Sequence, residues 1–283
     1  MIGFIIFYLV SVHLVVGMLL SLLVLSQRAL GERFFRFNGT ISLALLVLAQ
    51  LAYNVYVRGE AALSSRERVL YWQTHIDGAT PWLWAVAALL VGYLVGLPFR
   101  KYLISRMLLA AAAFSGAFSL TILSSDLVNG AIPSPVGVFL FPLDSILSAL
   151  ALGSVVICMI LGHWYLVDPG MPVRHLQIIA GLFIGVLIAR VLLGSYTSVL
   201  IWKELSSSGA DILSNVMLVN MLFIGQRILF GLILPLALSW MIWQTVKIRS
   251  TQSATGILYV AVVFILFGEF LSRYILVSIG YPL

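Results

Sequence analysis

The chain has 283 residues, of which 62% are hydrophobic and only 9% are charged. An ordinary soluble domain carries roughly 25% charged residues, so this composition excludes a soluble globular domain, a disordered chain and a nucleic-acid-binding domain. The formal charge of +6 suits basic residues that anchor membrane helices on one side of a bilayer. The single cysteine, Cys158, excludes a disulfide framework, a four-cysteine zinc site and iron–sulfur clusters held by this chain.

Eight apolar runs are long enough to cross a bilayer, which takes about 20 residues. They predict transmembrane helices over Gly3–Leu25, Gly39–Val57, Thr80–Phe99, Met107–Leu127, Pro142–Val167, Leu176–Leu200, Leu222–Val246 and Gly256–Ile279. The first run lacks a basic leading segment and a small-residue cleavage site, so it is interpreted as a helix rather than a signal peptide. We therefore expect an all-α integral membrane protein whose helices contact lipid.

The basic residues between these runs predict the orientation of the chain. The connections after the first, third, fifth and seventh helices hold nine of them: Arg28, Arg33, Arg36, Arg100, Lys101, Arg106, Arg174, Lys247 and Arg249. The other connections hold four: Arg58, Arg66, Arg68 and Lys203. Because short basic connections stay in the cytoplasm, we expect a multi-pass protein of the inner (cytoplasmic) membrane with both termini in the periplasm.

The two halves of the chain show a weak likeness to each other. A shift of 141 residues lays the first four helices over the last four, with Arg33 over Arg174 and Val15–Met18 over Val156–Met159. Each half has an even number of helices, so both halves enter the membrane from the same side, as in a parallel repeat. We predict two four-helix bundles, formed by residues 1–130 and 131–283.

Several ionisable residues fall inside the predicted spans, where a charge costs several kcal/mol unless it is paired or hydrated. Counting 1.5 Å per residue along each helix places six charged residues in the outer half of the membrane: Arg190, Arg227, Glu269, Arg273, Asp126 and Asp144. His13 lies near the middle. One interpretation of Glu269 and Arg273, four residues apart, is an internal salt bridge that neutralises the helix. The two further arginines leave excess positive charge, which favours an acceptor-rich ligand, the two outer carboxylates or water.

The four histidines do not fit a bis-histidine haem. His75 lies in an outer loop and His175 at the inner edge, and His13 and His163 differ in depth by roughly 15 Å at 1.5 Å per residue. We therefore expect no haem to be held by this chain, although the depth count alone leaves a His/Met or His/Tyr haem open. We also expect no metal site, and we find no hydrolase or nucleotide-binding motif.

Two charged stretches carry a resemblance to a known family. Phe264–Arg273 has the pattern apolar-Gly-Glu-x-x-x-Arg, and Arg227–Phe230 places an arginine at the opening of a long apolar helix. Together with eight helices and outward termini, these stretches distantly resemble the NrfD/DmsC-type membrane anchors of polysulfide and DMSO reductases. Pro142, Ser145, Ser148 and Gly153 loosely follow the same family pattern. The chain departs from the family near the outer end of the second helix, where Tyr53–Tyr56 contains no histidine.

The resemblance implies a site for a quinone, menaquinone or ubiquinone, in the outer half of the membrane. The chain would be either the non-catalytic or the quinol-oxidising subunit of a respiratory oxidoreductase complex. Electrons would pass to or from a periplasmic iron–sulfur or multihaem cytochrome subunit, beside other membrane subunits. The residues expected to be catalytic are Glu269, Arg273 and Arg227, and those expected to bind the quinone are Arg190, His13, Asp144 and Asp126. On this interpretation Glu269→Gln stops quinol-linked electron transfer and leaves assembly intact.

Two other functions remain open. The chain could be a secondary transporter for a small anion, although no span is clearly interrupted by Gly/Pro pairs in both halves, as broken-helix sites require. It could also be a structural or assembly subunit whose charges only pair with neighbouring helices. Co-purification separates these functions, because a quinol-oxidising subunit brings down a redox protein and a transporter purifies alone.

Overall fold

The computed structural model describes residues 2–58, 67–99, 102–125, 135–168, 170, 172–207 and 221–279. In this part of the chain eight helices are long and apolar enough to cross a membrane. The prediction of an all-α, eight-span membrane protein is thereby confirmed. Asp126 lies outside the described residues.

The helices follow one another in chain order. They are α1 (Ile2–Val24), α2 (Gln27–Ala52), α4 (Glu67–Gly96), α5 (Tyr102–Ser125), α7 (Pro135–Val167), α8 (Arg174–Ser207), α10 (Leu234–Lys247) and α11 (Thr251–Ile279). The seventh span runs over Met221–Lys247 and contains the π-helical turn η3 (Leu229–Ile233) followed by α10. A second π-helical turn, η1 (Tyr53–Arg58), extends α2, and a 3-10 turn, η2 (Leu97–Phe99), extends α4.

The second and third spans begin well before the apolar runs that predicted them. The second begins at Gln27 rather than Gly39, and the third at Trp72 rather than Thr80. In the early turns of α2, Phe34 and Phe35 are buried while Arg33 is exposed, so this part of the helix is amphipathic. A hydropathy average misses such turns because it does not register which face each residue occupies.

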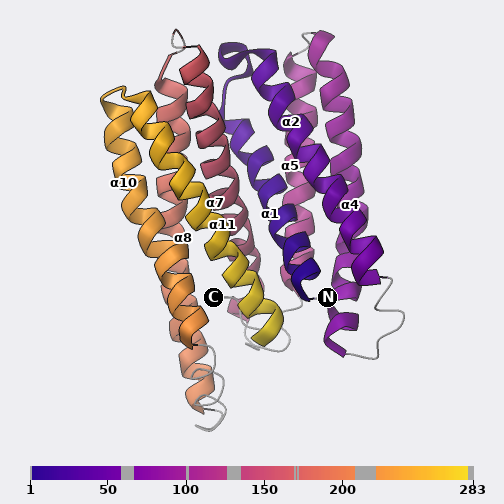
Figure 1. Ribbon diagram of the computed structural model, residues 1–283. Coiled ribbons are helices and arrows are strands. Elements are labelled where there is room, and N and C mark those ends of the chain that lie inside the picture. Colours follow the sequence, from indigo (N-terminus) through magenta and orange to yellow (C-terminus); the bar gives the residue numbers. More distant parts are fainter. Residues whose placement is uncertain are drawn as a thin grey trace.

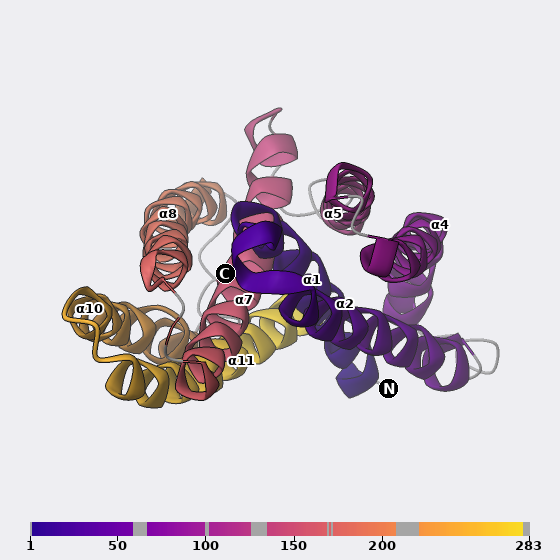
Figure 2. The ribbon, with the colours of Figure 1, turned by 90° about the horizontal axis from the view of Figure 1, so that it is seen from above.

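The helices of the two halves lie on either side of a central pair, α1 and α7. Figure 2 shows α2, α4 and α5 on one side and α8, α10 and α11 on the other. The α1–α2, α4–α5, α7–α8 and α10–α11 connections all lie at one end, here called the basic end (Figure 1). Helix α1 begins and α11 ends at the opposite end, here called the terminal end (Figure 1). The proposed repeat between the halves stays a prediction.

Helices α1 and α7 cross in backbone contact. A Cβ atom added to Gly17 would lie 1.7 Å from the carbonyl oxygen of Ala149, and one added to Gly153 would lie 1.8 Å from the carbonyl carbon of Gly17. Only glycine permits this approach, as in other tightly packed membrane helices. The same seam continues one helical turn toward the terminal end, where His13 of α1 meets Ser145 of α7.

We predict that Gly153→Ala destabilises the protein, because its methyl group would force the two backbones apart. Overpacking of this kind costs about 1–3 kcal/mol or more, and thermal unfolding in detergent measures it. Gly194→Ala in α8 is the control, since a Cβ there meets no atom within 4 Å. Equal melting temperatures for the two variants would contradict the close crossing.

Candidate functional site

Four buried charged side chains from three helices form one ionic cluster. Glu269 and Arg273 come from α11, Arg190 from α8 and Arg227 from the Met221–Lys247 helix, and Glu269 is only 1% exposed. These four residues are called the arginine–glutamate cluster below. The structure therefore brings together residues that the depth count placed in one half of the membrane.

Glu269 is the centre of this cluster. Arg190 Nη1 donates to its Oε1 atom, and Arg227 Nη2 lies 3.5 Å from the same oxygen. Arg273 Nη2 lies 3.6 Å from Oε2. The hydroxyl of Ser148 on α7 donates to Oε2 and accepts a 2.7 Å hydrogen bond from Arg273 Nη2. Both carboxylate oxygens are thus engaged, and the contacts join α7, α8, α11 and the Met221–Lys247 helix.

Two glycines, which have no side chain, leave room for the Arg227 guanidinium. A Cβ on Gly231 would lie 1.8 Å from Arg227 Nη1, and a Cβ on Gly268 would lie 2.3 Å from the Cα of Gly231. Gly231 belongs to the π-helical turn η3, a distortion that often marks functional sites in helices. The guanidinium therefore occupies space that any larger residue at position 231 would take.

The cluster carries more positive than negative charge. Its three arginines and one glutamate leave two positive charges, and Asp144, one helical turn from Ser148 on α7, offsets one of them. Asp144 makes no hydrogen bond or ion pair with the residues that the structure describes. The Nε atoms of Arg190 and Arg273 are buried and have no hydrogen-bond partner within the described ranges. This arrangement suits a ligand that supplies hydrogen-bond acceptors.

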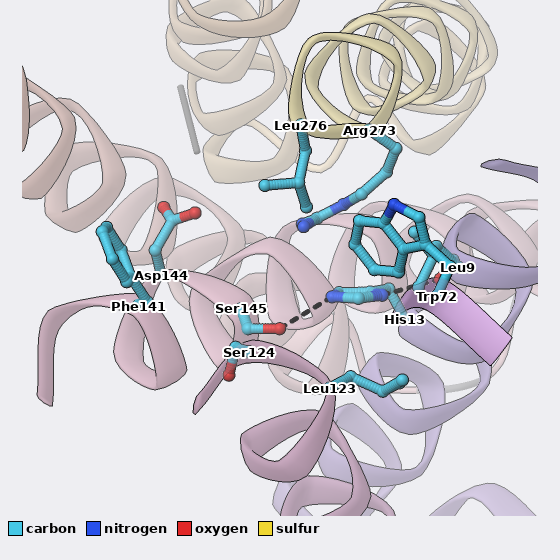
Figure 3. Close-up of a pocket in the computed structure, with 10 residues that line it drawn as sticks. All are labelled: Leu9, His13, Trp72, Leu123, Ser124, Phe141, Asp144, Ser145, Arg273 and Leu276. Carbon is cyan, nitrogen blue, oxygen red and sulfur yellow. Dashed lines mark hydrogen bonds between the residues drawn. The ribbon is translucent and has the colours of Figure 1, made fainter. Parts of the chain in front are cut away.

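A small cavity borders the cluster toward the terminal end (Figure 3). Its volume of about 20 Å³ is enough for one water molecule. The lining residues are Leu9, His13, Trp72, Leu123, Ser124, Phe141, Asp144, Ser145, Arg273 and Leu276. They come from α1, α4, α5, α7 and α11, so the cavity lies where the two halves of the chain meet. Arg273 belongs to both the cluster and the cavity wall.

The hydrogen bonds of His13 indicate where its ring carries a proton. Its Nδ1 atom lies 2.6 Å from the carbonyl oxygen of Leu9, and its Nε2 atom lies 2.8 Å from Ser145 Oγ. A carbonyl oxygen only accepts, so Nδ1 carries a proton, and in the neutral ring Nε2 accepts from the serine hydroxyl. Both ring nitrogens are therefore occupied by protein groups (Figure 3).

Of the residues predicted for the site, Arg190, Arg227, Glu269 and Arg273 are in mutual contact, and His13 and Asp144 line the adjoining cavity. Asp126 lies outside the described residues. Sequence reasoning gave no role to Ser145 and Ser148. In the structure Ser145 contacts His13, and Ser148 contacts Glu269 and Arg273. Gly231 was also missed; its spacing of four residues from Arg227 was the available signal.

A second buried polar group lies between α1, α2 and α4. Tyr53 Oη donates a 2.7 Å hydrogen bond to Asp77 Oδ1, and Gln50 Nε2 donates to Tyr8 Oη over 3.3 Å. The rings of Tyr8 and Tyr53 lie 5.4 Å apart between centroids. Tyr53 occupies the region where the resembled family has a histidine, and here it holds the carboxylate of Asp77.

No protein-family model matches the chain, and a search of curated proteins finds no match either. The resemblance to the NrfD/DmsC-type anchors therefore stays a prediction. Within the described ranges, no group of three or more His, Cys, Asp or Glu side chains is placed to hold a metal ion.

We predict that Glu269→Gln destabilises the protein. This prediction from the contacts of Glu269 differs from the one made from the sequence, in which the variant still assembles. The substitution leaves three buried guanidinium groups without their carboxylate, and breaking a buried ion pair costs about 3–5 kcal/mol. Thermal unfolding and the yield of monodisperse protein in detergent measure the effect.

Glu32→Gln is the matched control for this variant. Glu32 pairs with Arg36 on an exposed helix surface, where an ion pair contributes about 0–1 kcal/mol. If Glu269→Gln melts at the wild-type temperature, the cluster does not hold the helices together.

Proposed function

We propose that the chain is the quinone/quinol-interacting membrane subunit of a respiratory electron-transfer complex. The observation that carries this proposal is a buried, net positive cluster that shares Arg273 with a cavity lined by His13 and Asp144. A quinol site needs a hydrogen-bond donor for the ring oxygens, acceptors for two protons and apolar walls for the ring and its tail. All three are present where the two halves of the chain meet.

The geometry distributes these tasks among the site residues. Glu269 is engaged by three arginines and a serine, so its role is that of counter-ion, and it keeps the Arg273 guanidinium charged and fixed. Arg273 is the donor to a ring oxygen. Asp144 accepts a proton from the quinol hydroxyl, because its carboxylate lines the cavity and makes no hydrogen bond or ion pair with the described residues. His13 is the second acceptor, through Nε2, after the Ser145 hydroxyl turns away from that nitrogen.

The cavity must widen before a quinone ring binds. A volume of about 20 Å³ holds one water molecule, which is far less than a six-membered ring occupies. Three apolar side chains, Trp72, Phe141 and Leu276, form the walls that can turn aside. Side-chain rearrangements of this size are common when binding sites fill.

The proposed electron partner lies outside the membrane. The single cysteine supplies no set of ligands for an iron–sulfur cluster, so the electrons pass to a partner subunit. By the positive-inside rule the basic end faces the cytoplasm and the terminal end faces the periplasm. The cavity lies toward the terminal end, which supports the proposal of a periplasmic iron–sulfur or multihaem cytochrome subunit as the electron partner of a chain in the inner membrane, beside other membrane subunits.

One observation favours a second function, the transport of a small anion. The excess positive charge of the arginine–glutamate cluster would also attract a free anion into the membrane. Uptake of an anion by proteoliposomes that contain this chain alone would support the transporter and contradict the quinol site. Loss of that uptake in Arg273→Gln would place the anion at the same cluster.

We predict that Asp144→Asn slows quinol oxidation by about 10²–10⁴-fold, the usual contribution of a positioned general base. The amide has nearly the shape of the carboxylate but does not accept the proton, so quinone binding stays close to wild type while the rate falls. Steady-state oxidation of a soluble quinol analogue by the intact complex measures the rate. Asp168→Asn, an exposed acid at the basic end, is the control. A wild-type rate in Asp144→Asn would remove Asp144 from the mechanism.

A further inference from the structure

A second, larger cavity lies at the basic end, on the far side of the protein from the proposed quinone site. Its volume is about 810 Å³. The residues that line it are Arg28, Ala29, Leu30, Gly31, Glu32, Arg33, Arg36, Trp164, Val167 and Asp168. They belong to the first turns of α2 and to the end of α7, so the cavity separates two helices from different halves of the chain.

A bend in α2 arranges the arginines around this cavity. Gly31 has φ +78° and breaks the helical path, a backbone conformation that glycine adopts without strain. Before the bend, the Arg28 guanidinium lies 5.5 Å from the centre of the Tyr102 ring. After it, Arg36 pairs with Glu32. Arg33 is exposed and makes no ion pair with the described residues.

The residues that line the cavity carry a net positive charge. Arg36 and Glu32 neutralise each other, and Arg28 and Arg33 face one remaining acid, Asp168. One positive charge is therefore left for a ligand. An arginine binds a phosphate through parallel charge-assisted hydrogen bonds, more strongly than a neutral donor does.

The position of the cavity places it at the surface of the bilayer. Helix α1 ends at Val24 and α7 at Val167, which are also the ends of the two candidate membrane spans. Trp164 forms one wall and packs edge-on against Phe34, with ring centroids 5.7 Å apart. Tryptophan favours this depth in membranes. Val167 is 76% exposed, so an apolar surface continues from the cavity toward the lipid.

We propose that this cavity binds the headgroup of an anionic phospholipid of the phosphatidylglycerol type. Its phosphate lies against Arg33 and Arg28, and the first methylenes of its chains follow Trp164 and Val167. The volume falls within the range of about 300–1,000 Å³ found for ligand sites, and the net positive charge favours an anionic over a zwitterionic headgroup. The bound lipid joins the α1–α2 connection to the end of α7. This inference does not depend on the proposed function.

Native mass spectrometry of the full chain in detergent, titrated separately with phosphatidylglycerol, phosphatidylethanolamine and phosphatidylcholine, tests the proposal. We expect one retained phosphatidylglycerol, and about tenfold weaker retention in Arg33→Gln, since a hydrogen bond to a charged group contributes enough to change affinity by that factor. Lys247→Gln is the control, because Lys247 is exposed at the same end and does not line the cavity. An unchanged melting temperature in Arg33→Gln shows that the fold is intact.

Four results would overturn the proposal. Arg33→Gln could retain the lipid as well as wild type, which removes the arginine from the site. Lys247→Gln could lose it equally, which indicates a diffuse surface charge. The zwitterionic lipids could bind as tightly as phosphatidylglycerol, which removes the charge preference. Inorganic phosphate at a matched concentration could displace the lipid, which indicates a site for free phosphate.

Discussion

Glu269 lies in the interior of a membrane protein with three guanidinium groups around it, and much of the surrounding structure follows from that fact. Charges removed from water must be paired or hydrated. The Glu269 carboxylate is therefore contacted by side chains from four helices: Ser148 of α7, Arg190 of α8, Arg273 of α11 and Arg227 of the Met221–Lys247 helix. The close approach of Gly231 to Gly268 and the π-helical turn make room for Arg227. The helices of the second half are thus positioned by one anion.

The excess positive charge of the cluster is suited to an anionic or acceptor-rich ligand. One carboxylate neutralises one guanidinium, whereas three are present, and Asp144 offsets only one more. Arg273 extends the positive charge into a cavity whose opposite wall comes from α1, α4 and α5 of the first half. The backbone crossing of Gly17 and Gly153 holds the two walls together, so the site depends on both halves of the chain.

The spans could be predicted, and so could a common level for Arg190, Arg227, Glu269 and Arg273, because both follow from local rules. Apolar runs of sufficient length predict helices, and a rise of 1.5 Å per residue predicts depth. The pairing of Glu269 with Arg190 could be expected only as a shared depth, since contact depends on helix rotation. Ser145 and Ser148 were noted only as part of a loose family pattern, because an isolated serine in an apolar helix does not indicate which side chain it contacts. The early start of α2 was missed because its first turns are amphipathic, with Phe34 and Phe35 buried and Arg33 exposed, and a hydropathy average does not register which face each residue occupies.

An electron cryo-microscopy map of the chain, purified with its native lipids and saturated with quinone, tests the central claim most directly. The account predicts ring-shaped density within hydrogen-bond distance of Arg273 and Asp144, with Trp72, Phe141 or Leu276 displaced from the cavity and the Glu269 ion pairs unchanged. Quinone density elsewhere on the chain, with the three apolar side chains in place and the cavity no larger than a water molecule, would contradict it.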